Sequence, residues 1–181
     1  MLRHIVIGLT SAFAAFFTWV AVQPSAFTVS RSATIAAPPA AVFAEINELK
    51  KWNAWSPWAK KDPAARTAYA GPASGVGSKF AWSGNKDIGE GEMTIVESRP
   101  VERVGLQLDF TKPFAGKSDV AFDLKPEGAG TVITWSLTGN HGFVERAFMA
   151  MMGVNMNDMV GGDYEKGLAA LKAVVEAKPK S

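Results

Sequence analysis

Apolar and polar residues alternate over the stretch that follows a long uncharged N-terminal segment. From Phe27 to Ile35 the odd positions carry mostly apolar residues and the even positions carry Ser and Thr. This alternation is typical of a half-buried strand. Arg31 is the exception, because it falls on the apolar face. It either lies at the solvated end of the strand or reaches into a cavity and meets an acid or a ligand.

The same two-residue period returns between residues 66 and 139, broken by turns rich in Gly and Pro. A short strand is predicted at 66–70, and residues 126–130 form the hairpin loop before the last strand. The predicted inward-facing residues are Phe80 and Trp82, then Met93 and Ile95, then Val104, Leu106, Leu108 and Phe110, then Val120, Phe122 and Leu124, and finally Ile133, Trp135 and Leu137. The pattern predicts about seven antiparallel strands.

The spacing changes to three and four residues between Val154 and about Ala177, which predicts a long amphipathic helix. Its apolar stripe needs a partner, and the strands supply one. We therefore expect an α+β fold in which a curved sheet closes around this helix. Gly161 and Gly162 each cost such a helix about 1 kcal/mol relative to Ala, so another element or a ligand is expected to approach the backbone there.

Two short helical segments are predicted between the first strand and the second. One follows Pro38-Pro39 and ends near Asn47. The other contains Trp52, Trp55 and Trp58, and Pro57 is expected to interrupt it. These tryptophans either plug one end of the core or line an aromatic wall for a hydrophobic ligand. Residues 143–152, rich in Phe and Met, are expected to form a short amphipathic or lid-like segment before the long helix.

Residues 5–22 contain no charge and are nearly long enough to cross the hydrocarbon core of a bilayer. An uncleaved anchor is favoured over a signal peptide, because the stretch is long and no small-x-small cleavage pattern precedes Pro24. Arg3 on the short side places the N-terminus in the cytoplasm and the domain outside the inner membrane, in the periplasm. The residues expected to face lipid include Ile5, Phe13, Phe17, Trp19 and Val22.

Length and composition fit one domain with an appendage: an anchor and linker at 1–26, a domain at 27–177 and a tail at 178–181. Nineteen basic and seventeen acidic residues give a net charge of +2, too balanced to favour a nucleic acid. The absence of cysteine excludes disulfides, thiol nucleophiles and cysteine-ligated metals. We expect no metal and no cofactor.

Catalytic candidates are few. His141 is the only imidazole of the domain and is either a surface residue of a turn or a general base at a cavity mouth. Glu97 shares the parity of Met93 and Ile95, so it is expected to point inward or to lie at the end of the sheet. With Arg31, these residues are the polar groups that an enzyme would use.

Large apolar side chains give a stronger signal than the polar ones. There are too many of them on inward faces for a sheet that must also leave a cavity, so some are expected to form its walls. The predicted cavity residues are Trp52, Trp55, Trp58, Phe80, Trp82, Met93, Phe110, Trp135, Met156, Met159 and Tyr164.

Four stretches carry a resemblance to a known family. They are FTVSRSATIAAPPAAVFAEI from Phe27, WNAWSPWAKKDP from Trp52, the segment from Gly89 to Pro100 and GGDYEKGLAALK from Gly161. The chain resembles the START-like (helix-grip, SRPBCC) superfamily in these four segments and in its order of elements. Within that superfamily it resembles the bacterial polyketide cyclase/dehydrase-type proteins with an N-terminal membrane segment. The resemblance implies a deep, mostly apolar cavity between the sheet and the long helix.

Three functions follow as hypotheses. The leading one is a membrane-tethered binder of a hydrophobic small molecule or lipid. The second is a cyclase- or dehydratase-type enzyme that uses Arg31, Glu97 or His141. The third is a stress-related interaction module whose interior is filled by its own aromatic side chains. Fold alone does not choose among them.

Overall fold

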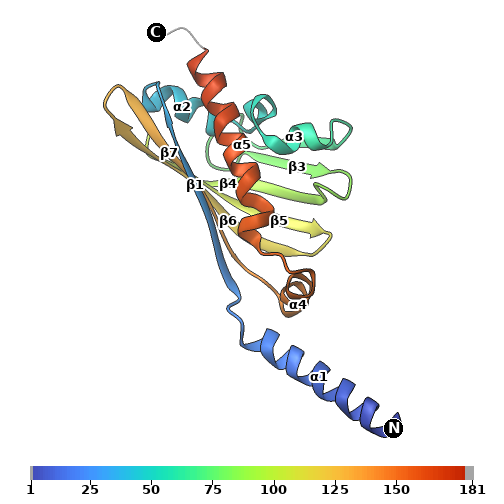
Figure 1. The fold of residues 1–181 in the computed structure, drawn as a ribbon. Coiled ribbons are helices and arrows are strands. Elements are labelled where there is room, and N and C mark those ends of the chain that lie inside the picture. The colour runs from blue at the N-terminus through green and yellow to red at the C-terminus, as the bar shows by residue number, and fades with distance from the viewer. Residues whose placement is uncertain (1, 178–181) are drawn as a thin grey trace.

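The computed structural model describes residues 2–177 and contains one sheet, one long C-terminal helix and a separate N-terminal helix (Figure 1). The predicted tail at 178–181 lies outside the described residues. The elements are α1 (Leu2–Val22), β1 (Ala26–Ile35), α2 (Pro39–Ile46), the 3₁₀ helix η1 (Leu49–Ala54), α3 (Pro57–Lys61), β2 (Arg66–Ala70), β3 (Lys79–Ser83), β4 (Glu90–Arg99), β5 (Arg103–Lys112), β6 (Gly116–Glu127), β7 (Gly130–Asn140), α4 (Phe143–Met152) and α5 (Met156–Glu176).

All seven strands form one antiparallel sheet in the order β1-β7-β6-β5-β4-β3-β2. The first strand in sequence pairs with the last, while the strands between them follow as hairpins. The sheet curves, and α5 lies across its inner face with α2 and α3 beside it (Figure 1). This arrangement confirms the predicted α+β fold and the helix-grip order of elements.

Prolines determine where the two short helices after β1 begin. Pro39 occupies the first turn of α2, and Pro57 occupies the first turn of α3. A proline at this position has a preset φ and lacks only an N–H that the helix would leave unpaired. The predicted interruption at Pro57 is therefore confirmed: Trp52 lies in η1 and Trp58 in α3.

Helix α5 begins at the Asn155 cap, whose side chain accepts a hydrogen bond from the N–H of Asp158 at 3.0 Å. Its buried stripe includes Tyr164, Leu168, Leu171 and Val175, and it packs along β1 and against α2, η1 and α3. Each residue of the stripe follows the one before at three or four positions, as the sequence pattern predicts.

Two glycines of α5 allow close approach by side chains of the sheet. A Cβ at Gly161 would lie 2.2 Å from the Arg31 Nη2, and one at Gly167 would lie 2.7 Å from the Trp135 Cζ3. The expected close approach is thus confirmed at Gly161, but Gly162 has no atom within 4 Å of its Cβ position. The sequence argument did not single out Gly167.

Helix α1 stands apart from the sheet and contacts α4 (Figure 1). Residues Arg3–Val22 are long and apolar enough to cross a membrane. The five side chains predicted to face lipid, Ile5, Phe13, Phe17, Trp19 and Val22, are all exposed. The main hydrophobic cluster is built from β1 and the elements that follow, and Val20 is the one described apolar residue of α1 that is fully buried.

Candidate ligand-binding site

A cluster of aromatic rings fills the space between the sheet and α5. Trp135 of β7 stacks on Tyr164 of α5, with ring centroids 3.9 Å apart, and lies 4.8 Å from Phe122 and 5.6 Å from Trp55. Tilted and edge-to-face contacts link Trp52 to the same rings. We call these five residues, Trp52, Trp55, Phe122, Trp135 and Tyr164, the aromatic cluster. All five are buried, so the Trp-rich segment forms part of the core.

Two indole N–H groups in this cluster make no well-aligned hydrogen bond within the described part of the chain. The Nε1 of Trp55 is buried without a partner and the Nε1 of Trp135 is buried beside the Tyr164 phenol, whereas the Nε1 of Trp52 donates to the carbonyl of Ile46 at 3.1 Å. An unpaired buried donor costs about 1–3 kcal/mol, so few proteins keep one without a reason. A ligand with an oxygen acceptor would satisfy either group.

Burial also acts on Tyr164. Loss of solvent around the phenol disfavours its ionised form and raises the pKa of Tyr164, and the neighbouring Trp135 offsets this effect only in part. The pKa in the folded protein therefore exceeds that in the unfolded chain, which is about 10. The stability that this group contributes is complete below the unfolded pKa and is lost as pH rises towards the folded one.

Alkaline titration tests this prediction. In a Tyr69→Phe variant, Tyr164 is the only tyrosine, since the chain has two. We expect its tyrosinate absorbance to stay low through pH of about 10 and to rise only as the domain unfolds, as followed by circular dichroism. A reversible rise near pH 10 with native circular dichroism would contradict the buried placement.

A second set of aromatic side chains lies on the inner face of β2, β3 and β5, where α5 does not pack. Their ring centroids form a chain of contacts: Tyr69 to Phe80 at 5.1 Å, Phe80 to Trp82 at 5.9 Å and Trp82 to Phe110 at 5.6 Å. We call these four residues the aromatic row. Its members keep part of their surface exposed, and Met93 beside them is also only partly buried. The row is therefore apolar surface still available to a ligand.

A small pocket of about 60 Å³ lies at the end of the row, between the sheet and α4. Phe27, Phe110, Phe114, His141 and Glu145 contribute to its walls, with Met156 at the start of α5. Drug-sized ligands occupy roughly 300–1,000 Å³, so the pocket as it stands holds only a small part of such a molecule. In this pocket an aromatic wall and a titratable pair meet.

His141 is buried at this pocket, which excludes the surface alternative. Its ring stacks on Phe27 with centroids 4.2 Å apart, and its Nδ1 lies 3.0 Å from the Glu145 Oε1. This contact is close and polar but is not a well-aligned hydrogen bond. A His next to a carboxylate has the composition of a general-base pair.

A larger depression of about 310 Å³ lies at the turn between β3 and β4, and glycine, proline and polar residues line it: Gly84, Asn85, Lys86, Gly89, Glu90, Lys112 and Pro113. Hydrogen bonds from Lys112 and Ser83 hold the pKa of Glu90 below its usual value. The ion pair between Glu90 and Lys112 spans 3.0 Å. These two charges neutralise one another, and the lining contains neither an aromatic nor a large aliphatic side chain.

Arg31 ties β1 to α5. Its Nε donates to the Glu165 Oε1 at 2.6 Å, and its Nη1 donates to the Asn157 Oδ1 at 3.0 Å. The side chain therefore meets an acid, as one alternative expected, but it does so at the exposed Glu165 and not inside a cavity. The guanidinium lies against Gly161, whose missing side chain leaves room for it. This contact positions the long helix and leaves no obvious catalytic task for Arg31.

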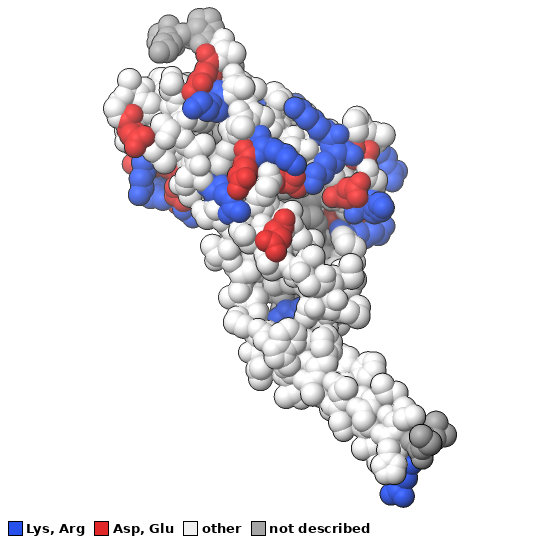
Figure 2. All heavy atoms as spheres, viewed as in Figure 1, with Lys and Arg blue, Asp and Glu red and all other residues white. Residues whose placement is uncertain are grey.

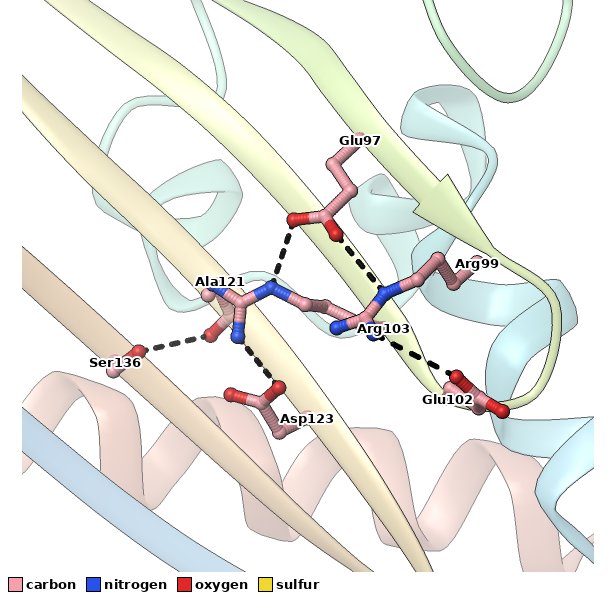
Figure 3. Close-up of polar contacts among 7 residues, drawn as sticks. All are labelled: Glu97, Arg99, Glu102, Arg103, Ala121, Asp123 and Ser136. Carbon is pink, nitrogen blue, oxygen red and sulfur yellow. Dashed lines mark hydrogen bonds and ion pairs between the residues drawn. The ribbon is translucent and has the colours of Figure 1, made fainter.

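Glu97 lies on the outer face of the sheet near the hairpin end of β4, so of its two expected positions the inward one is wrong. A register shift between Ile95 and Glu97 places Glu97 opposite Gly105 while Ile95 stays opposite Leu106. Such a bulge adds a residue to one strand and reverses the side-chain alternation beyond it. Figure 3 shows Glu97 pointing at Arg99 and Arg103, on the side of the strands turned away from the helices.

These charges form a network of ion pairs. Glu97 contacts the Nε atoms of Arg99 and Arg103 at 2.9 Å each, and Arg103 also reaches the Asp123 Oδ1 at 2.6 Å (Figure 3). The hydrogen bond to Asp123 is the main cause that raises the pKa of Arg103. The network is therefore structural.

A Glu97→Gln variant is expected to lose less than about 1 kcal/mol of unfolding free energy, because Arg103 keeps Asp123 and exposed ion pairs contribute little. Urea unfolding followed by tryptophan fluorescence measures the loss. Glu102→Gln is the matched control, since Glu102 is more exposed and contacts Arg99 only at 3.8 Å. A loss of ligand binding in Glu97→Gln, with the control unaffected, would contradict the outer-face placement.

The structure distributes the other predicted cavity residues over three environments. Trp58 packs edge-on against Trp135 and Tyr164 at the margin of the aromatic cluster. Met156 lines the pocket. Met159 is 55% exposed and points to solvent, away from the inner face of the sheet. The sequence analysis missed Phe27, Phe114 and Glu145 as pocket residues. Glu145 lies in the predicted amphipathic segment at 143–152, four positions after His141. That spacing could have indicated that the two side chains lie close together.

A curved antiparallel sheet closed on a C-terminal helix, with an aromatic interior, defines the class of helix-grip, START-like domains. Residues 26–176 match the model of the family described as polyketide cyclase / dehydrase and lipid transport. The chain therefore belongs to this family. No match to a curated protein was found.

Solved structures of low sequence identity share the fold. A Chromobacterium violaceum protein, CV1439, has a TM-score of 0.60 at 16% identity, covering 83% of this chain and 98% of its own. Aha1 from Colwellia psychrerythraea, solved as a dimer, has the same TM-score and identity over 83% and 97% of the two chains. The di-domain ARO/CYC protein StfQ of the steffimycin biosynthetic pathway has a TM-score of 0.57 at 10% identity, covering 83% of this chain and 51% of StfQ. At these identities the likeness establishes the fold alone.

Proposed function

We propose that the protein is a membrane-tethered binder of a hydrophobic small molecule or lipid, held on the inner face of the sheet beside α5. The observation that carries this proposal is the aromatic row, Tyr69, Phe80, Trp82 and Phe110, which stays partly exposed on the inner face of the sheet. Contiguous exposed apolar surface of this kind is typical of a ligand-binding or interaction site. The row leads to the pocket that Phe110 and Phe114 line.

The unpaired indole N–H groups refine the ligand class. A ligand that extends from the row into the aromatic cluster meets the donors of Trp55 and Trp135. A molecule with a carbonyl, carboxyl or hydroxyl oxygen on an apolar body would pair with one of them, whereas a pure hydrocarbon would not. Side-chain rearrangement on binding is common, so rings packed in the ligand-free state are compatible with uptake. The lipid-transport part of the family description supports the same class.

Tethering rests on α1. A helix of this length and composition crosses a bilayer, and the basic Arg3 on its short side favours a cytoplasmic N-terminus with the domain in the periplasm of the cell. A membrane-impermeant thiol reagent tests this placement on intact cells carrying Val76→Cys, because the natural chain has no cysteine. Labelling without cell lysis is the expected result, and labelling only after lysis would reverse the orientation.

Native mass spectrometry can identify the ligand once the domain has been released from α1. A protease site inserted at Pro24-Ser25 separates α1 from the domain, whose main hydrophobic cluster is built from β1 and the elements that follow. Native mass spectrometry of the released domain, without added detergent, is expected to show a co-purifying hydrophobic molecule. A Phe110→Ala variant should retain less of it, while Val96→Ala, at an exposed position of β4, serves as the control. An empty domain that also takes up no fluorescent fatty acid or sterol would contradict the proposal.

Two specific observations favour the other candidates. The His141–Glu145 pair at the pocket favours an enzyme of cyclase or dehydratase type, with His141 as general base. Turnover of a bound polyketide-like molecule that His141→Gln abolishes without loss of binding would establish it. The dense aromatic cluster favours an interaction module without a ligand, and an empty domain in the experiment above would support that candidate.

A further inference from the structure

Helix α4 presents an apolar face that is largely exposed. Val144, Phe148, Met151 and Met152 recur at the spacing of one helix face, and all four are exposed, Val144 by 70% and Met151 by 71%. Phe143 and Phe114 extend this surface, since Phe114 lies beside Phe148 with ring centroids 5.7 Å apart. We call these six residues the α4 patch. Contiguous exposed apolar surface of this kind marks an interaction site.

The two charged residues of α4 are used inside the protein and leave the patch uncharged. Glu145 turns to His141, at 3.0 Å. Arg146 donates from Nη1 to the carbonyls of Val20 at 3.2 Å and of Gln23 at 2.5 Å, at the C-terminal end of α1. Val20 lies in the last turn of α1 and Gln23 directly follows the helix, so the guanidinium complements the negative end of the helix dipole. The outward face thus keeps only Phe, Val and Met side chains.

The patch lies next to the end of α1 that faces the domain. Phe17 of α1 stacks near Phe143 of α4, with ring centroids 6.1 Å apart. The connection from α1 to β1 is residues 23–25, and three residues span at most roughly 10 Å. Figure 2 shows the charged side chains gathered over the part of the domain far from α1, with an almost uncharged surface between them and the distant end of α1.

We propose that the α4 patch lies in the interfacial region of the bilayer that α1 crosses. The proposal rests on the membrane span of the proposed function and names the surface on which the domain sits. Transfer of Phe and Met side chains from water to the boundary between headgroups and acyl chains lowers the free energy. An amphipathic helix lies flat in this region with its apolar face buried. The uncharged face can enter this region without moving an ion out of water.

This orientation gives the site a source of ligand. The pocket lined by Phe27, Phe110, Phe114 and His141 adjoins α4, so it opens at the end of the domain turned to the membrane. A hydrophobic molecule can then pass from the bilayer to the aromatic row along Phe114 and Phe110 without crossing bulk water. The ligand class is thereby narrowed to molecules that partition into membranes.

Site-specific fluorescence on the full-length chain tests the proposal. Since the natural chain lacks cysteine, single variants Val144→Cys, Met151→Cys, Phe13→Cys and Val76→Cys each carry one environment-sensitive label. Val76 is the matched control, because it is an exposed valine in the β2–β3 loop near the Asn47 end of α2, away from α4. Phe13 reports on the span itself. The protein is reconstituted into vesicles of phosphatidylethanolamine and phosphatidylglycerol that contain no spin label, lipids spin-labelled near the headgroup, or lipids spin-labelled deep in the acyl chain.

We expect blue-shifted emission and a loss of fluorescence to spin-labelled lipid at positions 144 and 151, and neither change at 76. Quenching at 13 by deeply labelled lipid, with positions 144 and 151 behaving like 76, would overturn the α4 proposal and leave the span intact. Quenching at 144 and 151 without quenching at 13 would support the patch and overturn the span. Emission at 144 that is blue-shifted but insensitive to spin-labelled lipid would show that a second copy or another protein covers the patch, which also overturns the proposal.

Discussion

Replacing Trp135 with alanine is expected to lower the free energy of unfolding by about 3–5 kcal/mol, the range for a fully buried aromatic residue. Trp135 is at the centre of the aromatic cluster, where it touches Trp52, Trp55, Phe122 and Tyr164. The indole fills the space between β7 and α5, and neither the sheet nor the helix can move far enough to close the cavity. A loss of this size removes much of the stability of an ordinary domain.

Urea unfolding of the full chain in a mild detergent, followed by circular dichroism, measures the loss. Trp19→Ala is the matched control, because Trp19 is an exposed tryptophan of α1 outside the hydrophobic core. The control should leave the unfolding midpoint unchanged. A Trp135→Ala variant that loses less than about 1 kcal/mol would mean that the aromatic cluster does not hold α5 on the sheet.

The second large effect is expected at Gly167. A methyl group there would lie 2.7 Å from the Trp135 Cζ3 and 3.1 Å from the Cδ of Pro57. Both neighbours are parts of rings with little freedom to withdraw, so Gly167→Ala is expected to cost about 1–3 kcal/mol despite the better helix propensity of alanine. Gly167 thus sets the distance between α5 and the sheet.

Gly162→Ala provides the matched control on the same helix. No atom lies within 4 Å of its Cβ position, so the propensity term acts alone and should stabilise the protein by about 0.5–1 kcal/mol. Thermal or urea unfolding of the two variants measures the pair. Opposite signs for the two substitutions are the expected result, whereas a stabilising Gly167→Ala would show that α5 does not pack tightly on Trp135.

Local patterns were sufficient to predict most of the fold. The alternation around Phe80, Met93 and Leu106 predicts which face of the sheet is buried, because each strand has one apolar side and one polar side. Pro57 predicts the break between η1 and α3 through a steric rule that tertiary contacts did not override. The spacing in α5 likewise predicts its buried stripe.

Those patterns do not predict the register of paired strands or the contacts between residues that are far apart in the sequence. A single bulge after Ile95 reverses the direction of Glu97, and strand periodicity in one chain cannot locate such an insertion. His141 was placed in a turn, yet stacking on Phe27 buries it, because β1 and β7 pair across more than a hundred residues of sequence. The aromatic cluster and the aromatic row look alike in sequence. Only the path of α5 decides which rings it covers.

The clamp of Arg146 on the end of α1 has a consequence for how far this protein can travel. A ligand-binding domain on a long flexible linker can cross the aqueous space and deliver its ligand to a facing membrane. Here a three-residue connection and two hydrogen bonds from Arg146 hold the domain against the end of its own anchor. If α1 spans the bilayer as proposed, the domain searches in two dimensions, and both donor and acceptor of its cargo must lie within the same leaflet.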